Sequence, residues 1–274
     1  MNQTNKETTL KEHILERKGC SLHYWVGGKN GQPLVVLTHG ACVDHHSFDA
    51  LAPVVAEKYR VMTWDVRGHG LSQPMDGEFS ITRAVEDLLA LMDKLGEEKA
   101  VLIGHSNGTY IGQEMAFHHP DSVKAMVIAD GTCITWPRTA MEIKIVYGSN
   151  GLMKMLPYES LKTLGLPAFS AKKEVRDYLY NAFSMLDKAS YLAIWKGATA
   201  CLHPEPGYQI QQPVLLVHGE NDATGDIRKI APKWAARLPN CQYEVMRDAS
   251  HMAPMDQPET FNRLVMEFLE KWAK

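Results

Sequence analysis

Short apolar runs alternate along the chain with segments whose apolar residues recur every three or four positions. A run of four to eight apolar residues is typical of a buried strand, whereas the wider spacing is typical of a helix lying on a sheet. Strand patterns occupy residues 12–17, 21–25, 33–38, 59–66, 99–103, 123–129, 213–217 and 242–246. Helical patterns occupy residues 48–58, 81–95, 109–119 and 258–274. The alternation predicts an α/β fold: a mostly parallel central sheet of about eight strands with helices on both faces.

The alternation stops between residues 132 and 206. Helical patterns without an intervening strand fill this stretch, at residues 139–147, 151–164, 171–185 and 188–198. The stretch is also rich in aromatic and methionine side chains, which suit the apolar walls of a substrate pocket. We therefore expect a core domain formed by residues 1–131 and 207–274, with residues 132–206 inserted as a helical cap, or lid.

One pentapeptide, Gly104-His105-Ser106-Asn107-Gly108, joins a strand pattern to a helical pattern. A serine hydroxyl is a poor nucleophile at neutral pH unless a base removes its proton. A sharp strand-to-helix turn exposes the serine Oγ, and glycines on either side let the backbone turn without a Cβ clash. The motif in this context predicts Ser106 as a nucleophile.

A carboxylate follows the strand pattern at residues 213–217. Groups at the carboxyl ends of parallel strands lie at the edge where α/β sheets bind their ligands. A histidine that acts as a base needs a carboxylate to hold its tautomer. We assign this role to Asp222, with Glu220 as the competitor that lies closer to the strand.

The base is expected after the last strand, because a nucleophile on such a turn precedes its acid and its histidine in the chain. His251 lies between the strand pattern at 242–246 and the final helix. This position selects it from the 12 histidines of the chain. Right-handed crossovers bring the strand ends to one edge, so Ser106, Asp222 and His251 should meet.

Two backbone N–H groups are expected to bind the oxyanion. Asn107, the residue after the nucleophile, supplies one, and a loop after an earlier core strand supplies the other. The strand at residues 33–38 ends in His39-Gly40-Ala41, which makes Ala41 the second donor. One such donor contributes roughly 2.7–4 kcal/mol to transition-state stabilisation.

Together these pieces resemble the α/β-hydrolase fold superfamily, from about residue 12 onward. Five segments in the superfamily's order carry the resemblance: His39-Gly40, residues 65–72 (Asp-Val-Arg-Gly-His-Gly-Leu-Ser), residues 104–108, the Asp222 loop and the His251 loop. The resemblance implies a serine-nucleophile member of the esterase or lactonase kind. Thr109 stands where many relatives carry a second glycine, a departure that touches helix packing more than chemistry.

The identity of residue 106 also separates the chain from two activities of that superfamily. Dehalogenases and epoxide hydrolases need a carboxylate nucleophile. The serine at position 106 therefore argues against both reactions.

The amino-acid composition and the net charge bear on the partners and the cellular location of the protein. A formal net charge of −3 over 274 residues offers no basic footprint for nucleic acid. The five cysteines are scattered without a CxxC pair, which is typical of reduced thiols and gives no zinc motif. No apolar stretch approaches ~18 residues and residues 1–11 are polar, so we expect a cytoplasmic protein without a membrane span or a secretory signal. We expect neither a cofactor nor a metal, and nothing in the sequence favours one oligomeric state.

Other polar residues near these motifs are expected to support the fold. The pair His45-His46 lacks a third ligand at matching spacing, so we interpret it as packing at the surface or at the pocket rim. His105 should point away from the nucleophile as a packed support. Asp65 and Arg67 are expected to brace loops, and Glu114 is expected to be buried or paired.

The resulting hypothesis is a serine hydrolase that cleaves a carboxylic ester of a small, largely apolar substrate through an acyl-enzyme. Ser106 attacks, His251 carries the proton, and Asp222 orients His251. Three alternatives stay open: a lactonase of the enol-lactone type, a C–C bond hydrolase with the same triad, and a receptor that binds a small ligand without turning it over.

Overall fold

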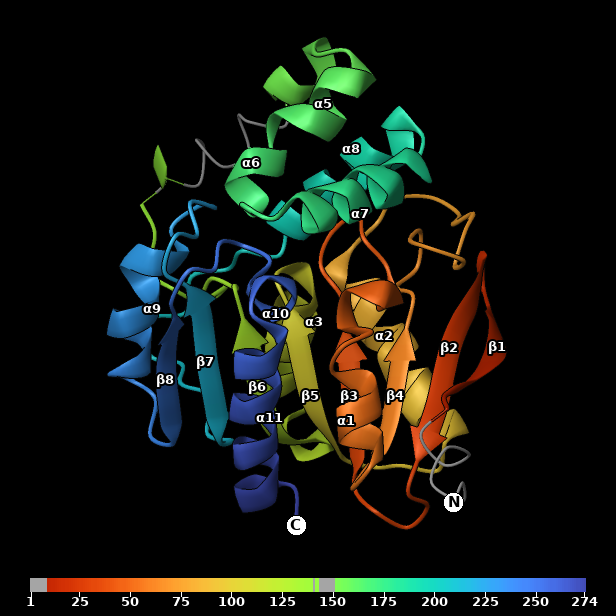
Figure 1. Ribbon diagram of the computed structural model, residues 1–274, viewed down its shortest axis with the longest axis vertical. Helices are drawn as coiled ribbons and strands as arrows, with labels where there is room; N and C mark the ends of the chain where they lie inside the picture. The colour runs from red at the N-terminus through yellow and green to blue at the C-terminus, as the bar shows by residue number, and fades with distance from the viewer. Residues whose placement is uncertain (1–8, 140, 143–150) are drawn as a thin grey trace.

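Eight strands form the sheet at the centre of the molecule, and their positions follow the strand patterns of the sequence. Their bounds are β1 (Lys11–Arg17), β2 (Cys20–Gly28), β3 (Leu34–Thr38), β4 (Arg60–Trp64), β5 (Ala100–His105), β6 (Val123–Ala129), β7 (Val214–Gly219) and β8 (Cys241–Met246). The computed structural model describes residues 9–139, 141–142 and 151–274. Across the sheet the order is β1-β2-β4-β3-β5-β6-β7-β8 (Figure 1).

The sheet is antiparallel at one edge and parallel elsewhere. β2 pairs antiparallel with β1 and with β4, whereas every pairing from β4 across to β8 is parallel. In the central strands β3, β5, β6 and β7, every residue except Lys124 is buried. Burial on both faces explains why these runs are continuously apolar rather than alternating. The fold class expected from the sequence is confirmed.

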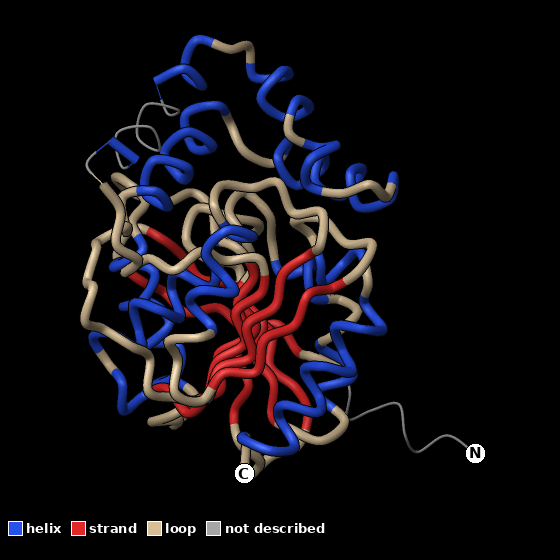
Figure 2. Tube along the Cα trace, turned by 90° about the vertical axis from the view of Figure 1, so that its left-hand side faces the viewer, coloured by secondary structure: helices blue, strands red, loops and turns tan. Residues whose placement is uncertain are grey.

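Helices lie on both faces of the sheet (Figure 2). On one face, α1 (Ala52–Ala56) and α11 (Pro258–Trp272) share a buried apolar cluster with Val35 of β3. On the other face, α2 (Ile81–Lys94), α3 (Asn107–His118) and α9 (Ile227–Ala235) share a second cluster with Leu34. Adjacent strand residues point to opposite faces, so one strand contributes to both clusters.

A further layer of helices lies over the carboxyl ends of the parallel strands (Figure 1). It contains α5 (Tyr158–Leu164), α6 (Leu166–Phe169), α7 (Lys173–Ser184) and α8 (Lys188–Thr199), all in the connection between β6 and β7. The Tyr178 hydroxyl of α7 donates a hydrogen bond to Asp44 Oδ1, in the loop after β3, at 2.9 Å. Within the described residues, no helix has the combination of length and apolar character that crossing a membrane requires.

Two of the predicted helices are broken near prolines. In place of one helix at 48–58, a short 3₁₀ helix (His45–Phe48) precedes α1, which has Pro53 in its first turn. In place of one helix at 151–164, helical residues 151–155 are separated from α5 by Pro157.

Other differences concern helices that are short or lie outside the described part. The predicted helix at 139–147 falls mostly on residues 140 and 143–147, which lie outside the described residues. Sequence reasoning did not anticipate α6, α9 or the short α10 (Ala253–Asp256). With four residues each, α6 and α10 show too little of the 3.6-residue period to be predicted from a sequence. By contrast, α9 has nine residues, and its buried Ile227, Ile230 and Trp234 do follow that period.

A buried ion pair holds the loop after β4 against α2. The Asp87 carboxylate is fully buried and accepts from Arg67 Nε at 2.5 Å and Nη2 at 2.6 Å. Arg17 of β1 donates to the same carboxylate at 3.2 Å. The brace expected from Arg67 is confirmed.

We predict that Asp87→Ala lowers the free energy of unfolding by about 3–5 kcal/mol, because the Arg67 guanidinium would stay buried without its counter-charge. Urea denaturation measures this loss. The control is Glu267→Ala, which breaks the exposed Arg263–Glu267 pair and should cost at most about 1 kcal/mol. Equal losses in the two variants would contradict a structural role for the buried pair.

Candidate active site

Ser106 occupies the turn between β5 and α3. Its φ of 48° and ψ of −115° lie in a region that residues other than glycine rarely adopt. The Ser106 N–H donates to the Ala129 carbonyl at 2.8 Å, which ties this strained residue to the end of β6. The serine therefore stands at the carboxyl edge of the sheet, beneath the helical layer.

The glycines of the pentapeptide allow backbone segments to approach closely. A Cβ on Gly108 would lie 2.1 Å from the Thr38 carbonyl oxygen, and one on Gly104 would lie 2.6 Å from the Gly108 carbonyl oxygen. Both distances are far inside van der Waals contact, so a larger residue would push α3 away from the sheet. The reason given from sequence for these glycines, that a Cβ would clash, is confirmed.

Thr109 stands where many members of the superfamily that the sequence resembles carry a glycine, and Gly131 makes room for it. A Cβ on Gly131 would lie 2.0 Å from Thr109 Oγ1. The Thr109 hydroxyl donates to the Ser106 carbonyl at 2.6 Å. The departure thus affects how α3 packs against the residues after β6, as expected from the sequence.

Three of the predicted site residues lie in one hydrogen-bonded line. His251 Nε2 is 3.0 Å from Ser106 Oγ, and His251 Nδ1 is 3.1 Å from Asp222 Oδ2. Both distances are within hydrogen-bond range, so Nδ1–H donates to the carboxylate and Nε2 accepts from the serine hydroxyl. The competitor Glu220 is exposed, and its Oε2 accepts from the Asp248 N–H at 3.4 Å.

Asp222 is ionised at neutral pH although its side chain is fully enclosed. Burial by itself would raise the pKa of Asp222. The hydrogen bond and charge of His251, together with the Thr224 N–H at 2.8 Å, hold the pKa of Asp222 below its ordinary value of 3.8. An ionised carboxylate in this position stabilises a proton on His251.

Buried groups hold the loop that carries His251. His105 Nε2 donates to the His251 carbonyl oxygen at 2.7 Å, and the two rings lie 5.3 Å apart. The Ser250 N–H donates to Asp256 Oδ2 at 2.8 Å. The expectation that His105 acts as a packed support is therefore confirmed.

Asp130 is a buried carboxyl that sequence reasoning missed. Its Oδ1 accepts from the Gly219 N–H at 2.8 Å, and its Oδ2 accepts from the Ala253 N–H at 3.2 Å. Burial, reinforced by the charge of Asp222, raises the pKa of Asp130 well above its ordinary value. Its position directly after β6 is the same signal that selected Asp222 after β7, and it would have identified this link between the two loops.

The two predicted oxyanion donors border the serine. Ala41 and Ser106 line the same small cavity, of about 20 Å³. Asn107 is the first residue of α3, where the backbone N–H groups have no acceptor within the helix. Among the described residues, neither the Ala41 N–H nor the Asn107 N–H donates to a protein acceptor. Both amides are thus available to an oxygen beside Ser106.

A larger cavity of about 710 Å³ adjoins the serine cavity. Phe169 and Trp195 line both cavities, so these two side chains form their common boundary. The Phe169 ring lies 5.6 Å from the His251 ring, and the Met252 N–H donates to the Phe169 carbonyl at 3.0 Å. The walls of the larger cavity are mostly apolar, with Arg138 and Asp226 among the charged exceptions.

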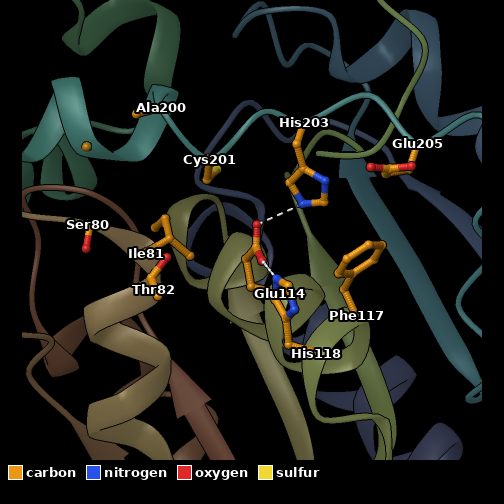
Figure 3. Close-up of a pocket in the computed structure, with 11 residues that line it drawn as sticks. Ser80, Ile81, Thr82, Glu114, Phe117, His118, Ala200, Cys201, His203 and Glu205 are labelled. Atoms are coloured by element: carbon orange, nitrogen blue, oxygen red, sulfur yellow. Dashed lines mark hydrogen bonds and ion pairs between the residues drawn. The ribbon is translucent and has the colours of Figure 1, made fainter.

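A separate pocket of about 430 Å³ lies among α2, α3 and the segment after α8 (Figure 3). In it, Glu114 accepts from His203 Nε2 at 2.9 Å and from His118 Nε2 at 3.2 Å. The pairing expected for Glu114 is confirmed. The described residues contain no group of three or more His, Cys, Asp or Glu side chains arranged to hold a metal ion.

The His45-His46 pair packs beside the loop after β3. His45 Nδ1 contacts Asp65 Oδ1 at 2.8 Å, and its ring stacks on Trp25 with 3.6 Å between centroids. Asp65 also accepts from the Leu71 N–H at 2.8 Å, which confirms it as a brace of the loop after β4.

Comparisons with known proteins agree with this architecture. A family model described as alpha/beta hydrolase fold matches residues 33–150. Fluoroacetate dehalogenase from Burkholderia sp is 36% identical over 95% of this chain and 94% of its own length. Epoxide hydrolase 4 from Homo sapiens is 25% identical over 94% of this chain and 78% of its own length. The crystal structure of the enol-lactonase from Burkholderia xenovorans LB400 has a TM-score of 0.82 and 23% identity, covering 94% of this chain and 100% of that chain.

Buried histidines near the site make stability depend on pH. Burial lowers the pKa of His69 to about 3 and that of His105 to about 3. Between pH 6.5 and about 3, the unfolded chain therefore binds protons that the folded chain does not. The contribution of these two histidines to the free energy of unfolding is complete above pH 6.5 and is lost as the pH decreases through this window.

We predict that His69→Asn reduces this loss, because Asn keeps a donor for the Arg67 carbonyl and does not titrate. Urea unfolding at pH 7.0 and 5.0 gives the difference in free energy for each protein. That difference should be smaller in the variant by about 2 kcal/mol, since one pKa unit corresponds to about 1.4 kcal/mol. An unchanged difference would show that His69 binds its proton as readily in the folded protein as in the unfolded chain, which would contradict the lowered pKa of His69.

Proposed function

Because the chain belongs to the α/β-hydrolase fold superfamily, we propose that it is a serine hydrolase that cleaves carboxylic esters through an acyl-enzyme. The superfamily supplies a hydrolytic scaffold, and the site decides which bond is cleaved. The observation that carries the proposal is the pair of hydrogen bonds, 3.0 Å and 3.1 Å, that link Ser106 through His251 to Asp222.

In the proposed acylation step, Ser106 Oγ attacks the carbonyl carbon while His251 Nε2 takes its proton. The Ala41 and Asn107 amides donate to the oxyanion of the tetrahedral intermediate. The intermediate collapses as the bond to the alcohol oxygen breaks, and His251 gives that oxygen its proton. Water then attacks the acyl-enzyme, with His251 again taking the proton, and the acid leaves as Ser106 is restored.

The serine also favours acyl transfer over the reactions named for two of the relatives. If Ser106 displaced a halide or opened an epoxide, it would form an ether, which water does not cleave under mild conditions. An acyl group on Ser106 forms an ester, which the same histidine-activated water hydrolyses. The dehalogenase and the epoxide hydrolase are thus relatives in fold whose named reactions do not suit this nucleophile.

The two cavities suggest how the substrate lies. About 20 Å³ beside Ser106 has room for little more than the scissile group. The adjoining 710 Å³ is within the range of sites for drug-sized ligands, so we assign the body of the substrate to it. Residues 132–206 then act as a cap that excludes water from the acyl-enzyme and walls the cavity.

A lactone is the second candidate substrate. Ring opening needs the same nucleophile, base and oxyanion donors, because a lactone is an internal ester. The likeness to the enol-lactonase from Burkholderia xenovorans LB400, over 100% of that chain, favours it over C–C bond cleavage.

We predict that Ser106→Ala reduces kcat on p-nitrophenyl esters by at least about 10³-fold, because the nucleophile is removed. The matched control is Glu220→Gln, since Glu220 is the exposed carboxylate two residues before Asp222. It should leave kcat within about twofold, because the exposed Glu220 side chain bonds to the Asp248 N–H and lines neither cavity of the site. Near wild-type ester cleavage by the serine variant would rule out the mechanism.

We predict that Phe169→Ala raises kcat/KM for octanoyl esters relative to acetyl esters by about tenfold, because it opens the boundary between the cavities. Initial rates on p-nitrophenyl esters of increasing chain length measure the preference. Phe117→Ala is the control, because Phe117 lines the pocket of Figure 3 and neither of these cavities. If both variants keep the wild-type preference, the acyl chain does not pass Phe169.

A further inference from the structure

The wall of the 710 Å³ cavity contains a tyrosine whose hydroxyl is free. Tyr110 of α3 is half-buried and lines this cavity. Its hydroxyl makes no hydrogen bond among the described residues, and its oxygen is not fully covered by protein atoms. A tyrosine hydroxyl that leaves bulk water usually finds a partner. For Tyr110 the cavity is the place where such a partner can lie.

Other tyrosines around the site have their partner within the protein. The Tyr158 hydroxyl of α5 donates to the Phe183 carbonyl at 2.6 Å, and the Tyr178 hydroxyl of α7 donates to Asp44 Oδ1 at 2.9 Å. A phenylalanine at position 110 would form the same wall without a polar group to satisfy. The free hydroxyl of Tyr110 therefore calls for a partner that the protein itself does not supply.

Tyr110 also lies close to the nucleophile along the helix. Ser106 is the N-cap residue of α3, and Tyr110 follows it by four positions. Residues four apart lie on one side of a helix, with about 5–6 Å between their Cβ atoms. A substrate that is attacked by Ser106 and fills the larger cavity therefore lies against Tyr110, because this side chain is part of the cavity wall.

An ion pair in the same wall favours an uncharged partner. Arg138 Nη2 donates to Asp226 Oδ2 at 3.1 Å, and Asp226 Oδ1 accepts from the Thr132 hydroxyl at 2.6 Å. The guanidinium is thus already paired, and the carboxylate disfavours a second anion beside it. Burial raises the pKa of Tyr110, and the charge of Asp226 adds to the rise, so the phenol keeps its proton at neutral pH and can donate it.

We infer that the Tyr110 hydroxyl donates a hydrogen bond to an uncharged oxygen of the substrate, a few bonds away from the scissile carbonyl. The substrate class is an ester or lactone that carries an ether, keto or hydroxyl oxygen there, next to an apolar body. A few well-placed polar groups in an apolar cavity are what fixes the orientation of a ligand. The inference rests on the proposed function for the position of the scissile bond, and it refines the largely apolar substrate expected from sequence.

The test places one ether oxygen along chains of equal length. The acyl series compares p-nitrophenyl hexanoate with the propoxyacetate, the 3-ethoxypropanoate and the 4-methoxybutanoate, in each of which oxygen replaces a different methylene. The alcohol series compares n-pentyl butanoate with the 2-ethoxyethyl and 3-methoxypropyl esters. The measured quantity is the ratio of kcat/KM for each ether-bearing ester to that for its plain parent.

Tyr110→Phe removes the hydroxyl and keeps the ring. It should lower the ratio that is highest in the wild type by about tenfold, which is about 1.4 kcal/mol of discrimination. A fall in the acyl series assigns the recognised oxygen to the acyl part, and a fall in the alcohol series assigns it to the alcohol part. Ratios that are unchanged in both series would overturn the inference.

Thermal unfolding separates a hydroxyl that meets the substrate from one that holds the fold. Tyr110→Phe should leave Tm unchanged or raise it, because the hydroxyl has no partner in the protein. Tyr158→Phe is the matched control: it should lower Tm by about 2–4 °C, since it removes a bonded hydroxyl. It should leave the ratios unchanged, because Tyr158 lines neither cavity. Equal falls in Tm for the two variants would contradict a free hydroxyl at position 110.

Binding to a variant that cannot turn over separates this inference from the proposed function. Calorimetry with Ser106→Ala and the same esters should show tighter binding of an ether-bearing ester than of its plain parent, and Ser106→Ala/Tyr110→Phe should lose the difference. If the wild type cleaves none of the esters but the binding difference holds, the hydrolase proposal fails and the recognition stands. Equal binding of ether-bearing and plain esters, or binding of neither, contradicts the recognition itself.

Discussion

The parallel sheet imposes the constraint on which the site depends: its strands end at one edge. Ser106 follows β5, Asp222 follows β7 and His251 follows β8, so residues 145 positions apart come within 3.0 Å. The pairing of the strands, with β5, β6, β7 and β8 adjacent in that order, sets the spacing of these loops. A change in the register of β5, β7 or β8 would move the side chain that follows that strand relative to the other two.

Ser106, His251 and Asp222 lie on loops or turns at the ends of strands. Buried polar groups fix the positions of these loops by hydrogen bonds to their backbone. Asp130 bonds one backbone N–H near each of the Asp222 and His251 loops, at 2.8 Å and 3.2 Å. His105 and Asp256 bind the His251 loop from either side of the histidine. The helical layer joins the same loop through the Met252–Phe169 backbone bond, so a residue at the boundary of the two cavities also contacts the loop of His251.

The strands of the sheet could be predicted from the sequence because strands buried on both faces are continuously apolar. Continuous apolar runs marked the central strands, and the order of serine, acid and histidine marked three loops that the structure brings together. The short helices α6 and α10 left too little periodicity to detect, and Pro157 split a helix that its apolar spacing predicted as one. Asp130 had the same positional signal as Asp222 but no motif to draw attention to it. The free hydroxyl of Tyr110 depends on what surrounds it in space, which no local pattern in a sequence reports.

Covalent trapping tests most directly whether this hydrogen-bonded line makes one alcohol reactive. The wild-type protein is incubated with diethyl p-nitrophenyl phosphate, and the labelled peptide is identified by mass spectrometry. We expect one diethylphosphoryl group per chain, attached to Ser106, with release of one equivalent of p-nitrophenol. Persistent ester cleavage with no adduct, or with the adduct on a different residue, would contradict the mechanism.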